Sequence, residues 1–281
     1  MADTGWLLGG TAISSDIDGG DVEWESPAGV KALGGNTYTW EMSNGEYTQH
    51  LLISNFSISL PDYAVVSGIS VRLNRDCVSD DDGDIVDDIV RLRKSTGYVG
   101  DDKAAYDWPS ATASQDYGSS SNLWGTTWSK AEVESSSFGV GIRASKVTTN
   151  VDADARLWYV QILVTYTIVV VDPIVTTQAV DDVGKVTATA NGNITDTGGA
   201  NATRRGFCYK VGTSGDPTTS DSVEYADGSF GTGAFDEAMS GLLPNTGYRV
   251  RAYAVNSAGT GYGTTVQLTT LTAFMAKVFM L

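Results

Sequence analysis

The sequence predicts an all-β protein made of two consecutive sandwich domains and a short apolar tail. Glycine, serine, threonine, aspartate and valine are abundant among its 281 residues, which is typical of short strands joined by tight turns. Several segments alternate apolar and polar residues with the period of two that a half-buried strand requires. All seven tryptophans and the only histidine, His50, precede Pro173. We therefore expect domains at residues 1–172 and 173–270, and a tail at 271–281.

The first domain shows the alternation most often. The apolar positions of its clearest patterns are Phe56/Ile58/Leu60, Ile69/Val71/Leu73, Val90/Leu92 and Trp158/Val160/Ile162/Val164/Tyr166. Turn-forming sequences such as Ser43–Gly45, Leu60–Asp62 and Asp82–Gly83 separate the patterns. Strands at this spacing, without a helical period of useful length, predict a two-sheet sandwich that is jelly-roll-like.

Four landmarks of the first domain resemble, in order and spacing, a module of phage and prophage virions. They are Asn55–Pro61, Val66–Val71, the aromatic and glycine-rich stretch Trp108–Gly139, and a strand that ends at Val164–Tyr166. The resemblance covers about residues 5–168. It implies a structural module that is located on the virion, and it implies no particular activity.

The second domain contains Leu243–Tyr248, which resembles the E–F corner of fibronectin type III domains, an immunoglobulin-like fold. In those domains the tyrosine hydroxyl bonds to backbone across the corner while the ring enters the core. The resemblance implies that Tyr248, Val250, Ala252 and Ala254 point inward and that the residues between them point outward. The outward residues are Arg249, Arg251 and Tyr253. No tryptophan occupies the usual core position, so we describe the domain as fibronectin type III-like rather than as a member of that family.

Residues Thr189–Asn193 and Thr203–Phe207 also resemble repeats of surface proteins from marine bacteria and their phages. This second resemblance covers about residues 174–270. It implies a spacer or a binding module rather than an enzyme.

The tail at residues 271–281 is largely apolar and carries one charge, on a lysine. A free segment of this composition aggregates unless it is covered. We expect its apolar side chains to make the assembly contacts of a homo-oligomer, which would be a trimer in a fibre. Those side chains are Phe274, Met275, Val278, Phe279 and Leu281. The alternative is an extra strand packed on its own domain.

The chain carries a net charge of -16, and most of the acidic excess precedes Pro173. Nucleic acid is therefore excluded as a partner, because phosphate backbones require a basic surface. The acidity favours solubility, and a specific cationic or metal partner is the alternative.

Apolar runs such as Ile168–Val171 are too short to cross a membrane. Cys77 and Cys208 fall in different domains, so no disulfide can form within a domain. No secretory signal is visible either, and we therefore expect synthesis in the host cytoplasm.

Catalytic and cofactor motifs are absent from the sequence, so we expect no enzyme, no catalytic residues and no cofactor. His50 lies in a strand-like setting without a nucleophile motif nearby. Glycoside hydrolysis needs two carboxylates at a set separation, and here the acids cluster in loops.

One acidic loop is a calcium candidate through Asp80, Asp82 and Asp84, because Ca²⁺ prefers several carboxylate oxygens. The loop fails the EF-hand pattern, since Gly83 as the loop glycine places Val78 first and Ile89 last. A solvated acidic turn is the alternative.

Aromatic rings in the glycine-rich stretch raise a further alternative. Trp124 and Trp128 are candidates for glycan contact, because exposed rings stack on sugar faces. Tryptophans beside glycines in a sandwich also cap the core and fix loops, which is the structural alternative.

These observations together predict a non-enzymatic phage structural protein on the virion surface, as a head decoration, a head fibre or a tail-associated component. Its partners would be other virion proteins, further copies of itself and a host surface glycan, the last through weak multivalent adhesion of the immunoglobulin-like domain. The alternative is a bacterial carbohydrate-binding accessory protein with a fibronectin-like spacer.

Overall fold

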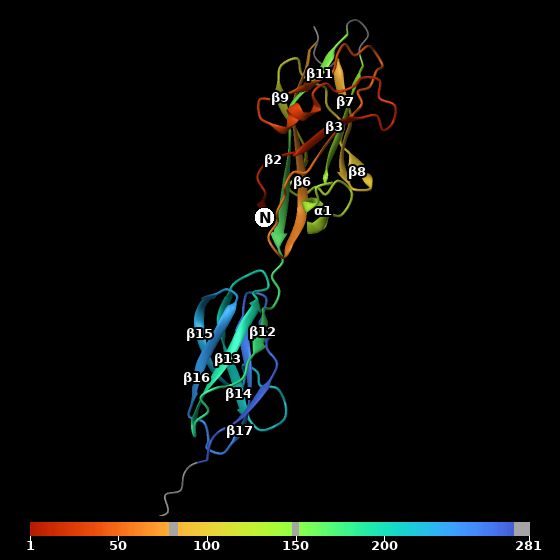
Figure 1. Ribbon diagram of the computed structural model, residues 1–281. Coiled ribbons are helices and arrows are strands. Elements are labelled where there is room, and N and C mark those ends of the chain that lie inside the picture. The colour runs from red at the N-terminus through yellow and green to blue at the C-terminus, as the bar shows by residue number, and fades with distance from the viewer. Residues whose placement is uncertain (79–83, 148–151, 273–281) are drawn as a thin grey trace, which may run out of the picture. The chain divides into compact units, whose positions relative to one another are not determined.

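A computed structural model describes residues 1–78, 84–147 and 152–272. The chain forms two compact units, Met1–Ile168 and Val169–Leu281. Both are built from antiparallel sheets (Figure 1). The all-β prediction is confirmed, with a jelly-roll-like sandwich followed by a fibronectin type III-like sandwich.

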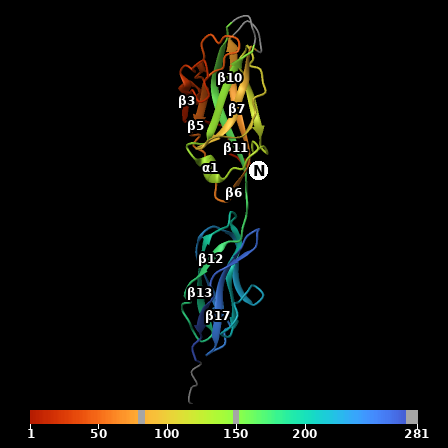
Figure 2. The ribbon, with the colours of Figure 1, turned by 90° about the vertical axis from the view of Figure 1, so that its right-hand side faces the viewer.

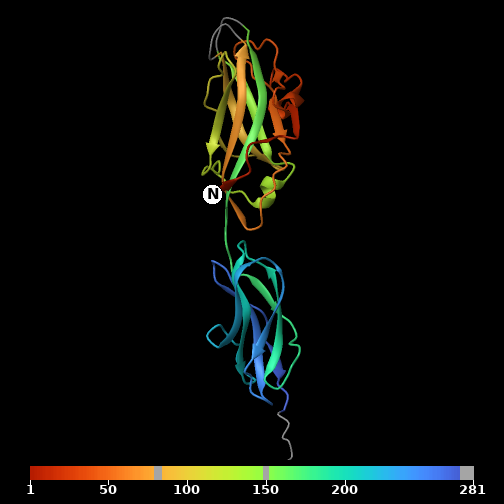
Figure 3. The same cartoon turned by 90° about the vertical axis from the view of Figure 1, so that its left-hand side faces the viewer.

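The first sheet of the first unit is centred on two long strands, β6 (Ala64–Val78) and β11 (Asp154–Ile168). They pair antiparallel along their whole length, as the orange and green ribbons in Figure 3 show. Strand β9 (Ala113–Ser119) pairs with β6. The remaining strands are short and pair with β11: β1 (Ala2–Asp3), β2 (Leu7–Leu8) and β4 (Thr37–Tyr38).

The second sheet of this unit has five strands that are neighbours in space in the order given (Figure 2). They are β3 (Thr11–Ser15), β5 (His50–Ser54), β10 (Gly139–Lys146), β7 (Ile85–Lys94) and β8 (Gly97–Asp102). Two short helices join the strands, η1 (Pro27–Lys31) and α1 (Lys130–Glu134). No helix among the described residues is long and apolar enough to cross a membrane.

The predicted alternation places the core correctly in β6, where Ile69, Val71 and Leu73 are fully buried. Two other patterns need correction. Phe56, Ile58 and Leu60 are buried, yet residues 55–61 form no strand, and Asn55 has a left-handed φ of 59° that interrupts an extended backbone.

Trp158 is the second correction. The register of β11 shifts between Leu157 and Tyr159, which is the signature of a β-bulge. Beyond the bulge the inward side chains are Leu157 and Ala155, whereas Trp158 is only partly buried. Its indole Nε1 donates to Asp76 Oδ2 at 3.0 Å.

The second unit is a sandwich of a three-stranded and a five-stranded sheet. The first sheet contains β12 (Ile174–Thr177), β13 (Thr187–Asp196) and β16 (Gly233–Ser240). The second contains β15 (Ser222–Phe230), β14 (Ala202–Val211), β17 (Gly247–Val255), β18 (Thr260–Tyr262) and β19 (Val266–Thr269). The rings of Phe207 and Phe235 meet between the sheets, with centroids 5.1 Å apart.

The predicted tyrosine corner is present. The Tyr248 hydroxyl accepts a hydrogen bond from the Leu243 N–H at 2.8 Å, and the Tyr248 ring is buried. Val250, Ala252 and Ala254 point into the core as expected. Tyr253 lies on the opposite face of β17, as predicted, but neighbouring side chains leave it only 1% exposed.

Candidate functional site

A β-bulge in β7 turns one carboxylate into the core of the first unit. The register between β10 and β7 pairs Arg143 with Ile89 and then Ala144 with Asp87, so Asp88 is the extra residue. The extra residue reverses the alternation of β7. Val90 remains inward on one side of the bulge, and Asp87 becomes inward on the other. Sequence alternation extended from Val90 would have placed Asp88 inward and Asp87 outward.

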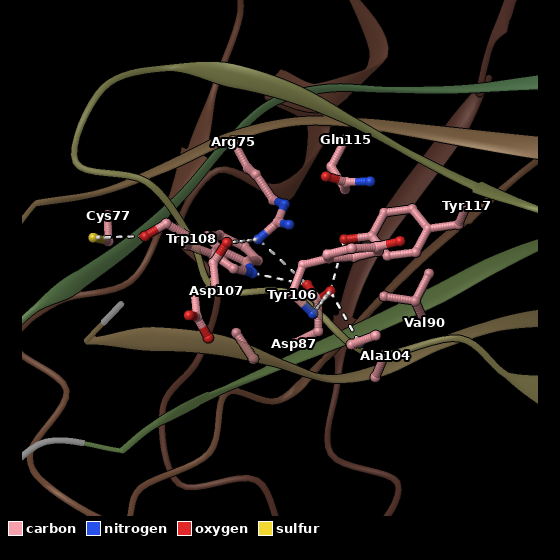
Figure 4. Close-up of polar contacts among 12 residues, drawn as sticks. Arg75, Cys77, Asp87, Val90, Ala104, Tyr106, Asp107, Trp108, Gln115 and Tyr117 are labelled. Carbon is pink, nitrogen blue, oxygen red and sulfur yellow. Dashed lines mark hydrogen bonds and ion pairs between the residues drawn. The ribbon is translucent and has the colours of Figure 1, made fainter. Parts of the chain in front are cut away.

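The Asp87 carboxylate is satisfied by groups from several segments (Figure 4). Its Oδ1 accepts from the Trp108 indole Nε1 at 2.8 Å. Its Oδ2 accepts from the Tyr117 hydroxyl at 2.7 Å and from the Tyr106 N–H at 3.1 Å. Burial raises the pKa of Tyr117 well above its usual range, so this hydroxyl stays protonated as the donor.

A buried cation completes the arrangement. Arg75 Nη1, from β6, lies 3.5 Å from Asp87 Oδ1, and both side chains are almost fully buried. The same nitrogen donates to the Asp107 carbonyl at 3.2 Å. Arg75 and Tyr117 belong to one sheet and Asp87 to the other, so the Asp87 network ties the two sheets of the sandwich together. We use "Asp87 network" for Arg75, Asp87, Tyr106, Trp108 and Tyr117.

A surface cleft of about 310 Å³ adjoins the Asp87 network. Tyr106 is 44% exposed at this cleft, and its ring meets the buried ring of Tyr117 edge to face with centroids 5.5 Å apart. Figure 4 shows the two rings next to each other beside Asp87. The cleft is lined by Asp102, Lys103, Ala104, Ala105, Tyr106, Asp116, Tyr117 and Gly118.

Charged groups of the cleft are held by neighbours. Asp102 Oδ1 accepts from the N–H groups of Val90 and Ala104 at 3.0 and 2.9 Å. Asp116 receives two parallel bonds from the Arg72 guanidinium, each 2.7 Å long. The Lys103 ammonium lies 3.7 Å from a carboxylate oxygen of Asp101, a residue that does not line the cleft.

His50 lies on the outer face of the second sheet and is nevertheless buried. Its Nδ1 is 2.6 Å from the Tyr98 hydroxyl, and its Nε2 is 3.5 Å from Asp18 Oδ2. Gly141 permits this contact, because a Cβ there would lie 2.1 Å from the Tyr98 hydroxyl. Burial lowers the pKa of His50, and the nearby Arg143 acts in the same direction. The surroundings favour a structural role for the neutral imidazole.

The second unit carries a patterned outer surface on its five-stranded sheet. The strand register places Tyr225, Gly206, Tyr253 and Tyr262 in one row across four strands. The Arg204 guanidinium lies 4.0 Å from the centroid of the Tyr225 ring.

At the other end of that row, the Arg251 guanidinium lies 4.5 Å from the centroid of the Tyr262 ring. Burial between these groups raises the pKa of Tyr253 to about 12. We call Arg204, Tyr225, Arg251, Tyr253 and Tyr262 the arginine–tyrosine face. The sequence did not predict that Arg204 and Tyr225 lie together, because the pairing of the strands is what brings them together.

The two tryptophans predicted to contact glycan lie in the core. Trp124 is fully buried, and its indole Nε1 donates to the Ile69 carbonyl at 2.8 Å. Trp128 is 6% exposed, and its Nε1 donates to the Leu123 carbonyl at 3.1 Å. Neither ring has a face open to a sugar, which corrects the expectation of an exposed glycan surface at these residues.

The calcium candidates are only partly described. Asp80 and Asp82 lie outside the described residues. Asp84 is buried, and its Oδ1 lies 3.6 Å from the Lys146 ammonium. Within the described part of the chain, no group of three or more histidine, cysteine, aspartate or glutamate side chains is arranged to hold a metal ion.

The predicted assembly residues of the tail also lie outside the described part of the chain. They are Phe274, Met275, Val278, Phe279 and Leu281. The described chain ends just before them, where the Leu271 N–H donates to the Gly184 carbonyl at 2.9 Å.

No protein-family model and no curated protein matches this chain. Solved structures resemble it at low TM-scores. The sensor domain of the anti-sigma factor RsgI4 of Pseudobacteroides cellulosolvens has a TM-score of 0.28 and 13% identity, over 37% of this chain and 100% of that one. A human fourth fibronectin type III domain has a TM-score of 0.31 and 17% identity, over 40% of this chain and 90% of that one. The glycoside hydrolase domain of Endo-D from Streptococcus pneumoniae has a TM-score of 0.26 and 13% identity, over 96% of this chain and 36% of that one.

Proposed function

We propose that this chain is a non-enzymatic structural protein of the virion surface whose second unit provides weak, multivalent adhesion. The assignment to a virion rests on the phage-module landmarks of the first unit. Adhesion rests on one structural observation, the arginine–tyrosine face. The first unit would provide the scaffold and the contacts to other virion proteins.

The arginine–tyrosine face has the composition of a recognition surface, because tyrosine and arginine are enriched where proteins bind partners. Tyr225 is 46% exposed and offers ring area to a partner. Arg204 is held against that ring and bonds to Asp227 at 2.7 and 3.1 Å. Side chains already held in place lose less conformational entropy when they bind.

The same contacts explain why each copy would bind weakly. Arg204 is paired with Asp227, and Arg249 beside the face is paired with Asp216 at 2.8 Å. A partner must therefore compete with an internal carboxylate for each of these guanidinium groups. Repeated copies on a particle would compensate for low affinity per contact. We propose a host surface glycan as the partner.

The location is tested on purified particles. Virions from the phage or prophage that encodes the chain are banded in a density gradient and labelled with a gold-conjugated antibody against the first unit. We expect the chain to band with the particles and the gold to decorate their surface. A chain found only in the soluble fraction would contradict the virion assignment.

Adhesion is tested with the full chain coupled to beads, which are mixed with host cells. We expect the coated beads to bind cells and Tyr225→Ala to reduce binding by about tenfold or more, since multivalency amplifies a loss in each contact. Val186→Ala is the matched control, because Val186 is 45% exposed and lies outside the arginine–tyrosine face. Equal binding by the two variants would contradict the assignment of adhesion to this face.

A further inference from the structure

The cleft beside the Asp87 network presents an aromatic ring that is fixed before any ligand arrives. The Tyr106 N–H bonds to Asp87 Oδ2, and the Tyr106 ring rests edge to face on Tyr117. Tyr117 is itself held by its hydroxyl bond to the same carboxylate oxygen. An exposed ring supported in this way loses little conformational entropy on binding.

Small residues in the lining of the cleft allow close approach. Ala104, Ala105 and Gly118 contribute almost no side-chain bulk. Gly118 has a φ of 77°, and a Cβ there would lie 2.3 Å from the Ile69 carbonyl oxygen. This position is therefore restricted to glycine by backbone conformation and by space. The volume of about 310 Å³ lies at the lower end of small-molecule sites.

The polar groups of the cleft define the class of ligand. Asp102 and Asp116 supply acceptors, and Lys103 supplies a donor. A carboxylate has about four lone-pair sites, so Asp116 retains acceptor capacity beyond its two bonds to Arg72. Arg72 is paired with Asp116 and Lys103 with Asp101, so neither cation beside the cleft is free to bind an anionic ligand. Fixed acceptors and a donor beside an exposed ring fit a neutral polyhydroxylated ligand.

We propose that this cleft binds one sugar residue of a neutral polysaccharide. The apolar face of the sugar stacks on Tyr106, and its hydroxyls bond to Asp102 and Asp116. This site goes beyond the proposed function, because it lies in the first unit and uses none of the arginine–tyrosine face. It also differs from the buried Trp124 and Trp128.

The proposal is tested by native affinity electrophoresis of the full chain in gels that contain dextran, laminarin, amylose or galactomannan. We expect at least one of these neutral polymers to retard the wild-type chain, and Tyr106→Ala to weaken that retardation by about tenfold, the scale of one lost ring contact. Tyr47→Ala is the matched control, since Tyr47 is 40% exposed and does not line the cleft. Retardation by none of the four polymers, or equal retardation of Tyr106→Ala and wild type, would overturn the proposal.

Further variants separate ring loss from misfolding and from the adhesion proposal. Tyr106→Phe keeps the ring, so we expect it to bind within about twofold of wild type. Val186→Ala lies in the second unit outside the arginine–tyrosine face and should be retarded like wild type. Retardation that Tyr225→Ala weakens and Tyr106→Ala does not would assign the polymer to the arginine–tyrosine face and overturn this proposal, so the two proposals fail or succeed separately. Gels with polygalacturonate and polylysine complete the set. Tyr106-dependent retardation by either charged polymer, without any by the neutral ones, would replace the proposed ligand with an ionic partner.

Discussion

The two units share a two-sheet antiparallel architecture but stabilise it with different chemistry. The first unit buries charged groups between or beside its sheets, including Arg75, Asp87, Lys146 and Asp84. Within the described residues of the second unit, the buried polar residues are the neutral Asn256 and Thr270. One sandwich thus depends on ionic contacts, and the other on neutral hydrogen bonds around an apolar core.

This difference matters because a buried charge has a large desolvation cost that only a complete set of partners offsets. Asp87 has such a set, with an indole, a phenol, a backbone N–H and a guanidinium around it. In the second unit, Asn256 forms an uncharged clasp. Its side-chain nitrogen donates to the carbonyls of Val171 and Thr197 at 2.7 and 2.9 Å. Removing one partner should therefore be more harmful in the first unit.

The chain offers a direct way to observe the two units separately. All seven tryptophans lie in the first unit, so tryptophan fluorescence reports the unfolding of that unit alone. Calorimetry of the same sample reports both units.

Asp87→Ala should have the largest effect. It leaves Arg75 buried without its carboxylate and removes the acceptor of Trp108 and Tyr117. We expect the free energy of unfolding of the first unit to fall by about 3–5 kcal/mol, measured by urea titration with tryptophan fluorescence. Asp62→Ala is the control, because the Asp62 side chain is 90% exposed. A loss no greater than that of the control would show that the Asp87 network contributes little.

Tyr248→Phe tests the neutral counterpart in the second unit. The substitution keeps the ring in the core and removes the acceptor of the Leu243 N–H. We expect a loss of about 1 kcal/mol, the usual value of one hydrogen bond, seen as a lower calorimetric midpoint of the second unit. The urea midpoint from tryptophan fluorescence should stay unchanged. A shift in that midpoint would mean that the units do not unfold independently.

The pH dependence should also differ between the units, because the single histidine lies in the first. Burial holds the pKa of folded His50 below the ordinary value of 6.5. As the pH falls through 6.5, the unfolded state therefore binds more protons than the folded state. The first unit should lose stability between about pH 7.5 and 5.5, measured by urea titrations at each pH.

His50→Gln provides the control for that measurement. Its first unit should show a weaker pH dependence over the same range, since the titrating group is gone. The second unit of either protein contains no histidine and should change less. A wild-type first unit that is equally stable across this range would contradict the depressed pKa of His50.

Sequence reasoning predicted the fold class and the features that depend on local pattern. The alternation of Ile69, Val71 and Leu73 marked a buried face, and Leu243–Tyr248 marked the tyrosine corner. Both depend on residues close together in the chain. The proposed virion function was reached from resemblance and remains a proposal.

Arg251 and Tyr253 were predicted to point outward, but the complete candidate sites were missed because they depend on pairing between distant strands. The bulge at Asp88 reverses the alternation. Its only sign in the local sequence is that the two buried residues Ile85 and Val90 lie five positions apart, whereas regular alternation requires an even spacing. The partners of Asp87 come from other segments, as do the neighbours of Tyr106. Trp124 was open to two interpretations because a glycine-rich setting does not specify whether a ring packs into the core or faces the solvent.

Asp227→Asn should have the smallest effect and tests the comparison from the opposite side. Arg204 and Asp227 form a well-aligned pair, yet their side chains are 41% and 61% exposed. Water and salt screen such a pair, and the Arg204 guanidinium stays solvated after the carboxylate charge is removed. We expect the calorimetric midpoint of the second unit to remain within experimental error of wild type, in contrast to the loss from Asp87→Ala. A clear destabilisation would show that surface ion pairs stabilise the second unit, and that burial of the charges is not what separates the two sandwiches.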